Sequence, residues 1–332
     1  MRILKVLSLS VLGSIMLSGC NNSKANNDEY IKKSDIVDPL VLFTKVTELK
    51  TAFYQQYGNK VELPENAKQC SAEITKNSNV YDYMDSKDAL SYTEDSEYAK
   101  DGEATFTALD KLMNEFKDIG FIKAIKNDNK TPALMFDIDN TLQLTSFDDD
   151  WFTKADMATP GAINFLKNQC FKDGVDCYFI TARYCYTDAA NSTEKWLKDN
   201  VGLTDEQIDK YVFLSGAIDD NLCATNPNEK VAYKDAFRQA LSEQRNVYWL
   251  MSVGDQMTDW YGSHSGMKVW YPNQMFHSDI VSNNYTDTSN CTEKTVVAPS
   301  EQCYNKLKDG ILQNSTIKYC KNFPKNEYYS GK

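Results

Sequence analysis

The chain has 332 residues, of which 42% are hydrophobic and 12% aromatic, enough to bury the core of one large domain or two modest ones. Its 36 Lys and Arg against 47 Asp and Glu give a formal net charge of −11, which argues against a nucleic-acid polymer as a partner. The two histidines are too few for the usual three-histidine zinc site. A metal would therefore be held by oxygen, as Mg²⁺ and Ca²⁺ are.

The N-terminal residues are typical of a bacterial export signal. Two early cations precede a short apolar run over 6–17, which is too short to span a membrane stably. Leu17-Ser18-Gly19-Cys20 resembles a lipobox, in which the cysteine receives a diacylglyceryl anchor; the alternative is an ordinary cleaved signal with a chance cysteine. We expect a signal peptide over 1–19, a polar tether over 20–35, and an exported protein anchored at Cys20 to a bacterial membrane, the outer membrane or one facing the periplasm.

The cysteines favour disulfides. Setting Cys20 aside, eight of the nine cysteines remain, an even number that is typical of disulfide pairing in exported proteins. No CxxC pair occurs, so a zinc ribbon or a thioredoxin-type site is unsupported. Cys170 and Cys177 lie beside a predicted helix end and strand start, which makes them candidates for a local pair.

Two amphipathic helices are predicted in an N-terminal helical region over 36–130. The first has Asp38-Pro39 at its start, apolar residues at helical spacing from Leu42 to Phe53, and a stop near Gly58. Residues 59–103 are polar and Tyr-rich, and we expect loops with short helices there. The second helix covers 106–119 and ends at Gly120.

From residue 131 the pattern alternates between strands and helices. The predicted strands cover 133–136, 177–180, 211–214, 247–251 and 267–270. The predicted helices cover 159–170, 189–197, a short segment capped by Thr204 with Gln207, and 229–243. This alternation predicts an α/β fold, with a Rossmann-like core over 131–272 whose mainly parallel sheet is flanked by helices. A Cys-containing extension over 273–332 follows.

Polar residues stand at the carboxyl ends of these strands, where open α/β sheets bind ligands. They are Asp137, Asp139 and Thr141 after the first strand, Thr181 and Arg183 after the second, and Asp255 and Asp259 after the fourth, with Lys234 on the preceding helix. Carboxylates beside buried strands are costly unless neutralised, and Mg²⁺ neutralises them readily. In such a site a carboxylate can attack phosphorus, a second can transfer protons, and hydroxyl and ammonium groups can hold phosphoryl oxygens.

The same residues resemble a known set of motifs. Phe136-Asp137-Ile138-Asp139-Asn140-Thr141 is similar to the DxDxT motif of the haloacid dehalogenase (HAD) superfamily. Ile180 to Arg183, Tyr233 to Arg238 and Val253 to Asp259 are similar to its second, third and fourth motifs, although Ala182 stands where the family usually has glycine. The Lys–Arg spacing and the Gly-Asp-Gln-x-x-Asp form are closest to the IIIB-like acid phosphatases, which include bacterial lipoproteins and plant vegetative storage proteins. The resemblance covers 131–272, under half of the chain.

This resemblance implies a HAD fold and an Mg²⁺-dependent acid phosphatase that hydrolyses phosphomonoesters, nucleotides included, through an aspartyl phosphate. It makes Asp137 the nucleophile and a metal ligand, and Asp139 the acid/base and a metal ligand through its backbone carbonyl. Thr181 and Lys234 would bind phosphate, with Lys230 as an alternative to Lys234.

Three assignments have alternatives. Asp255 is implied as a direct metal ligand and Asp259 as a water-mediated or orienting one, or else as a helix cap. Arg183 is implied as a phosphate or loop-orienting residue, or else as half of a surface ion pair. The competing functions are a non-catalytic storage or binding protein on the same scaffold, and a phosphotransferase that uses the same residues. The oligomeric state is left open, an oligomer included.

Overall fold

The computed structural model describes residues 38–57, 68–71, 97–143, 157–183, 187–214, 229–271, 292–306 and 308. The expected signal peptide, the tether and Cys20 lie outside the described residues. Within the described part, no helix combines the length and apolar character needed to cross a membrane.

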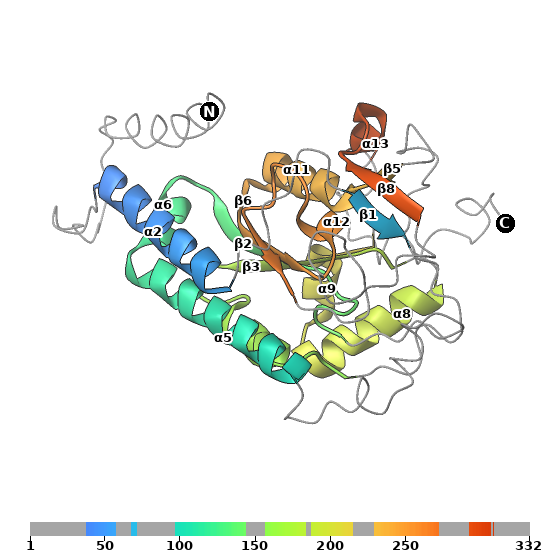
Figure 1. The fold of residues 1–332 in the computed structure, drawn as a ribbon, viewed down its shortest axis with the longest axis horizontal. Helices are drawn as coiled ribbons and strands as arrows, with labels where there is room; N and C mark the ends of the chain where they lie inside the picture. The colour runs from blue at the N-terminus through green and yellow to red at the C-terminus, as the bar shows by residue number, and fades with distance from the viewer. Residues whose placement is uncertain are drawn as a thin grey trace.

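The centre of the fold is a parallel sheet of five strands in the order β4-β3-β2-β6-β7. Figure 1 shows its strands β3, β2 and β6 in the middle of the molecule. The strands are β2 (Thr131–Phe136), β3 (Asp176–Thr181), β4 (Val212–Leu214), β6 (Val247–Gly254) and β7 (Met267–Trp270). Every neighbouring pair in this sheet is parallel. The predicted α/β class with a parallel, Rossmann-like sheet is therefore confirmed, with β2 in the middle of the sheet.

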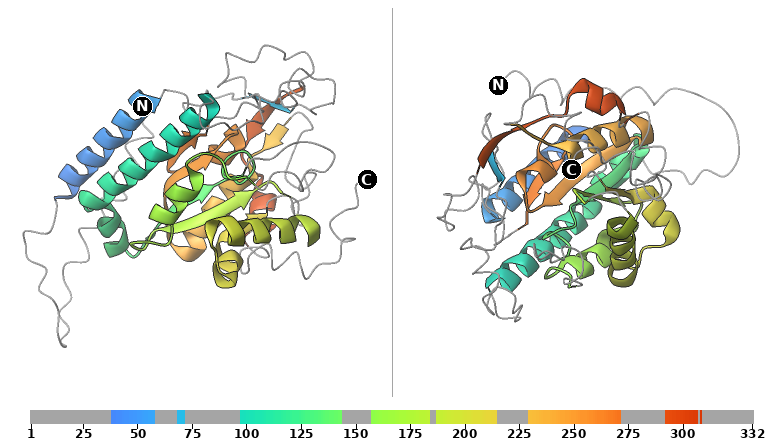
Figure 2. Two further views of the ribbon diagram at one scale, coloured as in Figure 1. Left: turned by 90° about the horizontal axis from the view of Figure 1, so that it is seen from below. Right: turned by 90° about the vertical axis from the view of Figure 1, so that its right-hand side faces the viewer.

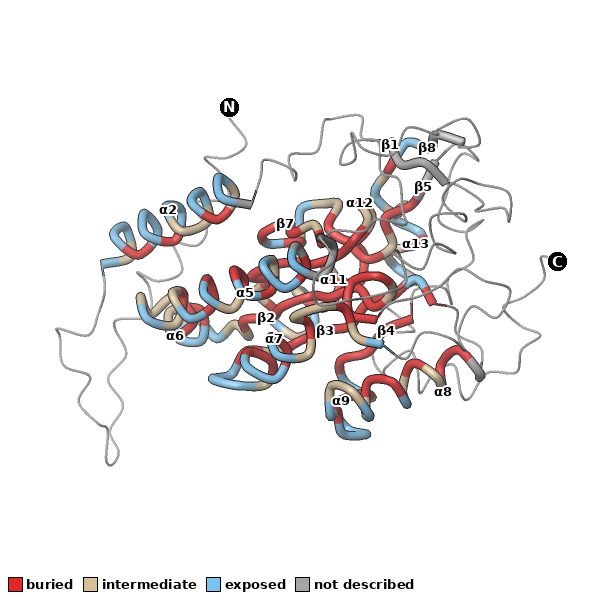
Figure 3. The backbone as a smooth tube through the Cα atoms, turned by 60° about the horizontal axis from the view of Figure 1, so that its bottom comes forward, coloured by how far each residue is buried: buried red, intermediate tan, exposed pale blue. Residues whose placement is uncertain are grey.

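Helices cover both faces of this sheet (Figure 2). Leu134 and Phe136 belong to a core shared with α5 (Glu97–Asp118), α6 (Phe121–Asn127) and α7 (Ala162–Gln169). The residues that alternate with them, Ala133 and Met135, belong to a core shared with α11 (Tyr233–Arg245) and α13 (Glu301–Lys306). The strands are consequently buried on both faces, whereas the outer surfaces of the helices are exposed (Figure 3).

The remaining helices lie around this sandwich. The first predicted helix is α2 (Pro39–Tyr57), which packs against α5. The chain also forms α8 (Thr187–Trp196), a π-helical turn η2 (Leu197–Val201), α9 (Asp205–Tyr211) and α12 (Met257–Trp260). The predicted cap of α9 is confirmed, because the Gln207 amide donates to Thr204 Oγ1 at 3.2 Å and the Thr204 amide donates to Gln207 Oε1 at 3.0 Å.

A second, three-stranded sheet was not predicted. It has the order β1-β8-β5 and joins β1 (Lys68–Ser71), β8 (Thr292–Val297) and β5 (Glu229–Val231). The prediction of a helix from residue 229 is wrong at its start, because 229–231 pairs in parallel with β8 and α11 begins only at Tyr233. Residues 59–103, expected as loops with short helices, contain β1 and the first turns of α5. Pairing between distant segments overrides the local preference of these short polar stretches.

One predicted disulfide is present. Cys170 is bonded to Cys177, which ties the end of α7 to the start of β3, and Cys303 is also disulfide-bonded. The bridge lies at the amino end of β3, away from the strand ends that carry the polar residues.

Removing this bridge should lower the free energy of unfolding without changing the site. A closed loop of this size contributes about 2–3 kcal/mol in the chain-entropy model. We expect urea unfolding to show a larger loss of unfolding free energy in the Cys170→Ala/Cys177→Ala variant than in Val175→Ala. The difference between the two losses should be about 2–3 kcal/mol. Val175 lies between the two cysteines and is fully buried, so Val175→Ala also deletes two heavy atoms from this region. Equal losses in the two variants would contradict the prediction.

Candidate active site

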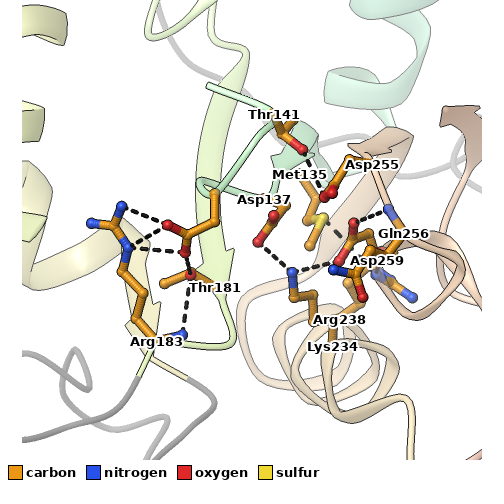
Figure 4. Close-up of polar contacts among 11 residues, drawn as sticks. Met135, Asp137, Thr141, Thr181, Arg183, Lys234, Arg238, Asp255, Gln256 and Asp259 are labelled. Carbon is orange, nitrogen blue, oxygen red and sulfur yellow. Dashed lines mark hydrogen bonds and ion pairs between the residues drawn. The ribbon is translucent and has the colours of Figure 1, made fainter. Parts of the chain in front are cut away.

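The polar residues of the strand ends meet at the carboxyl edge of the central sheet (Figure 4). Asp137 directly follows β2, and its amide donates to the carbonyl of Val253 on β6 at 3.0 Å. Thr181 is the last residue of β3, and Asp255 directly follows β6. Parallel strands end at the same edge, which is why residues more than a hundred positions apart converge here.

A buried lysine links two of the carboxylates. Lys234, the second residue of α11, places its Nζ 2.5 Å from Asp137 Oδ1 and 2.6 Å from Asp259 Oδ1. All three side chains are buried. Burial alone would lower the pKa of Lys234, but the charges of Asp137 and Asp259 outweigh it and raise that pKa above its usual value. Burial raises the pKa of Asp137, and Lys234 opposes that rise.

Three of the aspartates form a group that fits a divalent cation. Asp137, Asp255 and Asp259 are all buried, and one carboxylate oxygen of each lies within 4.8 Å of the other two. Two oxygens bound to one Mg²⁺ are at most about 4.2 Å apart, so small side-chain shifts suffice. The donor set consists of oxygens alone, which suits a hard cation such as Mg²⁺. The Thr141 hydroxyl donates to Asp255 at 3.4 Å and helps to orient that carboxylate.

Asp259 contacts the backbone at the start of α12 as well as belonging to the aspartate group. Its Oδ1 contacts Lys234, and its Oδ2 accepts from the amide of Gln256 at 2.8 Å, which makes it part of the N-terminal cap of α12. The alternative role as a helix cap is therefore present alongside its place in the cluster. Its carboxylate also packs on Gly254, where a Cβ would lie 2.2 Å from the Cβ of Asp259; only glycine leaves room there.

Asp139 belongs to a separate group of contacts, with Arg183 and Thr181. Arg183 Nε donates to Asp139 Oδ2 at 2.9 Å and its Nη2 to Oδ1 at 2.8 Å, while the Thr181 hydroxyl donates to Oδ2 at 3.3 Å. Arg183 also donates to Thr193 Oγ1 and Gln143 Oε1. The side chain of Asp139 is 22% exposed, against 7% for Asp137. Asp139 is therefore the carboxylate that faces solvent beside a buried one.

The structure thus divides the predicted site residues into two groups. The first contains Asp137, Lys234, Asp255 and Asp259, and the second contains Asp139, Thr181 and Arg183. Arg183 is paired with Asp139, but its side chain is buried, unlike in the alternative of a surface ion pair. Its role toward phosphate stays a prediction.

Sequence reasoning missed three residues that support these groups: Gln143, Thr193 and Arg238. Gln143 follows the first motif closely, so its position was a usable signal. Thr193 lies on α8 and offered no such signal. Arg238 ends the third motif, and that motif gives it no role of its own.

Comparisons with known proteins give a limited likeness. No family model matches the chain, and no curated protein matches it. Among solved structures, the Class C acid phosphatase from Bacillus anthracis is 19% identical with a TM-score of 0.37, over 58% of this chain and 90% of that chain. The tungstate-bound form of that protein is 20% identical with a TM-score of 0.39, over 61% of this chain and 91% of that chain. Both TM-scores are below 0.5, so the likeness is weak.

Replacing the buried lysine should destabilise the metal-free protein. Lys234→Met leaves Asp137 and Asp259 buried without their common counter-charge, and breaking a buried ion pair in this way costs about 3–5 kcal/mol. We expect that loss in urea unfolding measured with EDTA present. The double variant Lys234→Met/Asp137→Asn removes one of the two stranded charges and should recover part of the loss. A Lys234→Met variant as stable as the wild type would contradict the buried bridge.

Proposed function

We propose that this protein is an Mg²⁺-dependent phosphatase of the HAD type that hydrolyses phosphomonoesters through an aspartyl phosphate on Asp137. One observation carries the proposal: a buried aspartate at the end of the central strand contacts a buried lysine and shares an oxygen cluster with two further aspartates. A second carboxylate, Asp139, lies two residues away on the solvent side. The strand ends then supply the nucleophile, the acid/base and the ligand Asp255, while α11 supplies the lysine that binds phosphate and α12 supplies Asp259.

In the first step, a carboxylate oxygen of Asp137 attacks phosphorus while the bond from phosphorus to the ester oxygen breaks. Asp139 gives its proton to the departing alkoxide. Lys234 neutralises charge on the phosphoryl oxygens from its position against Asp137, with Thr181 as a further donor. Arg183 orients Asp139, because it contacts both of its carboxylate oxygens.

In the second step, water attacks the phosphorus of the aspartyl phosphate and transfers a proton to Asp139. The bond between phosphorus and the carboxylate oxygen of Asp137 breaks, phosphate leaves, and Asp139 is again protonated for the next cycle. Asp137 and Asp255 are the proposed direct ligands of the cation, with Asp259 orienting them. When bound, Mg²⁺ supplies charge neutralisation that favours attack by one anion on another.

An exported, lipid-anchored form is part of this proposal. The Leu17-Ser18-Gly19-Cys20 motif supports an anchor at Cys20, and the disulfide between Cys170 and Cys177 is typical of an oxidising compartment. The expected substrates are small phosphomonoesters outside the cytoplasm.

The nucleophile test uses Asp137→Asn and p-nitrophenyl phosphate. We expect hydrolysis to fall to the background rate, a loss on the order of 10³-fold or more, because the amide cannot form the covalent intermediate. Asp205→Asn is the matched control, since Asp205 lies on α9 and is largely exposed. Normal turnover by Asp137→Asn would refute the mechanism, and a folded wild type with no turnover of any phosphomonoester would favour the storage or binding alternative.

Metal removal gives an independent check. Dialysis against EDTA should abolish hydrolysis, and added Mg²⁺ should restore it. In Asp255→Asn, a proposed metal ligand is lost, so we expect the Mg²⁺ concentration for half-maximal activity to rise by at least about tenfold. Full activity in EDTA would show that the acidic cluster does not serve a catalytic cation.

A further inference from the structure

Arg238 is a fully buried cation that the proposed reaction does not use. It lies on α11, one turn after Lys234, and its side chain is 0% exposed. A buried guanidinium is costly unless its N–H groups are bonded. Burial accordingly lowers its pKa to about 10, against the opposing charges of Asp235 and Asp259. Such a group needs a structural reason for its position.

Its guanidinium donates to two backbone carbonyls of the segment that carries Asp259, and Nη1 also lies 4.0 Å from the sulfur of Met135 on β2. Arg238 Nη1 donates to the backbone carbonyl of Asp259, and Nη2 donates to the carbonyl of Tyr261 at 2.5 Å. These carbonyls belong to the last turn of α12 and its C-cap, where helix carbonyls have no partner within the helix. The guanidinium therefore caps α12 from its C-terminal end.

Asp235 holds the next part of the same loop. It lies 3.5 Å from Arg238 Nη2 and accepts from the amide of His264 at 3.3 Å. Gly262 has a φ of +99°, and a Cβ there would lie 2.1 Å from the carboxyl carbon of Asp235. The loop thus approaches Asp235 so closely that only glycine fits.

Two residues of α11 therefore contact Asp259, and a third contacts the loop that follows it. Lys234 contacts its carboxylate, Arg238 its carbonyl, and Asp235 the loop that follows it. Figure 4 shows Lys234 and Arg238 side by side on α11, both directed at Asp259. A shift of the backbone at Asp259 would move its carboxylate away from both Lys234 and the amide of Gln256.

We propose that Arg238 is a positioning residue for the cation site: it fixes the backbone at Asp259 and Tyr261, and through it the place of the Asp259 carboxylate beside Asp137 and Asp255. This inference rests on the proposed function, because it assumes that the aspartate cluster binds a divalent cation. Arginine is required because its planar fork reaches two carbonyls at once, whereas a lysine ammonium on a flexible stem is not shaped to bridge them.

The test measures Mn²⁺ binding to the full chain without substrate, by electron paramagnetic resonance titration of free Mn²⁺. Arg238→Lys keeps the charge and loses the bridge to the two carbonyls, which displaces the Asp259 carboxylate that orients the proposed ligands. We therefore expect its Kd for Mn²⁺ to rise by about tenfold, the lower end of the effect of losing an orienting residue. Arg245→Lys is the matched control. Arg245 lies on the same helix and donates to the carbonyl of Lys210, remote from the cluster, so its Kd should stay within about twofold of the wild type.

The outcomes distinguish a failure of the positioning role from a failure of the proposed function. A wild type that binds no Mn²⁺ overturns the proposed cation site itself. A wild type that binds Mn²⁺ and an Arg238→Lys variant that binds equally well overturn the positioning role, even if the variant melts at a lower temperature. If Arg238→Lys does not fold, Asp235→Asn tests the same set of contacts between α11 and the segment after Asp259. A several-fold loss of Mn²⁺ affinity in Asp235→Asn supports the inference, and unchanged affinity overturns it.

Discussion

Two buried aspartates that share one buried lysine are the constraint around which this fold is organised. Asp137 follows β2 and Asp259 lies on α12 after β6, and neither is tolerable in the interior without a counter-charge. Lys234 supplies that charge from α11. The bridge therefore couples stability to chemistry, since the residue that permits burial of Asp137 also stands where phosphoryl oxygens would gather. Disrupting these ion pairs would therefore lower the stability of the fold as well as alter the site.

The rest of the structure serves to bring α11 to this position. The Ala232 amide donates to the carbonyl of Val297 at 2.9 Å, so the small sheet fixes the residue that precedes the helix. That sheet combines β1, β5 and β8, which are far apart in the sequence. The central sheet also contacts this helix, because Trp249 Nε1 on β6 donates to the carbonyl of Arg238 at 3.0 Å. Both sheets thus contact α11 and fix its position. From this helix, Arg238 and Asp235 contact the loop after β6.

The predictions from sequence were best where the information is local. Apolar runs that end in aspartate or threonine identified β2, β3 and β6 with their polar ends, and the Thr204–Gln207 pair identified the cap of α9. They failed for 229–231, which were predicted as the start of a helix and form a strand by pairing with β8. Short strands of this kind have little pattern of their own, because their stability comes from the neighbouring strand. The local disulfide was within reach because its cysteines are only seven positions apart.

The sequence by itself determined the α/β alternation, the strand ends at which carboxylates emerge, and the residue types available for phosphate chemistry, since these depend on periodicity and local order. Only the tertiary structure decided how those residues are grouped. It turned Arg183 toward Asp139, placed Asp259 between Lys234 and the amide of Gln256, and buried Arg238 beneath the loop. The reason is physical: a buried charge takes whichever partner the packed backbone brings within hydrogen-bond distance, and that distance is set by the strand order and helix packing of the whole domain.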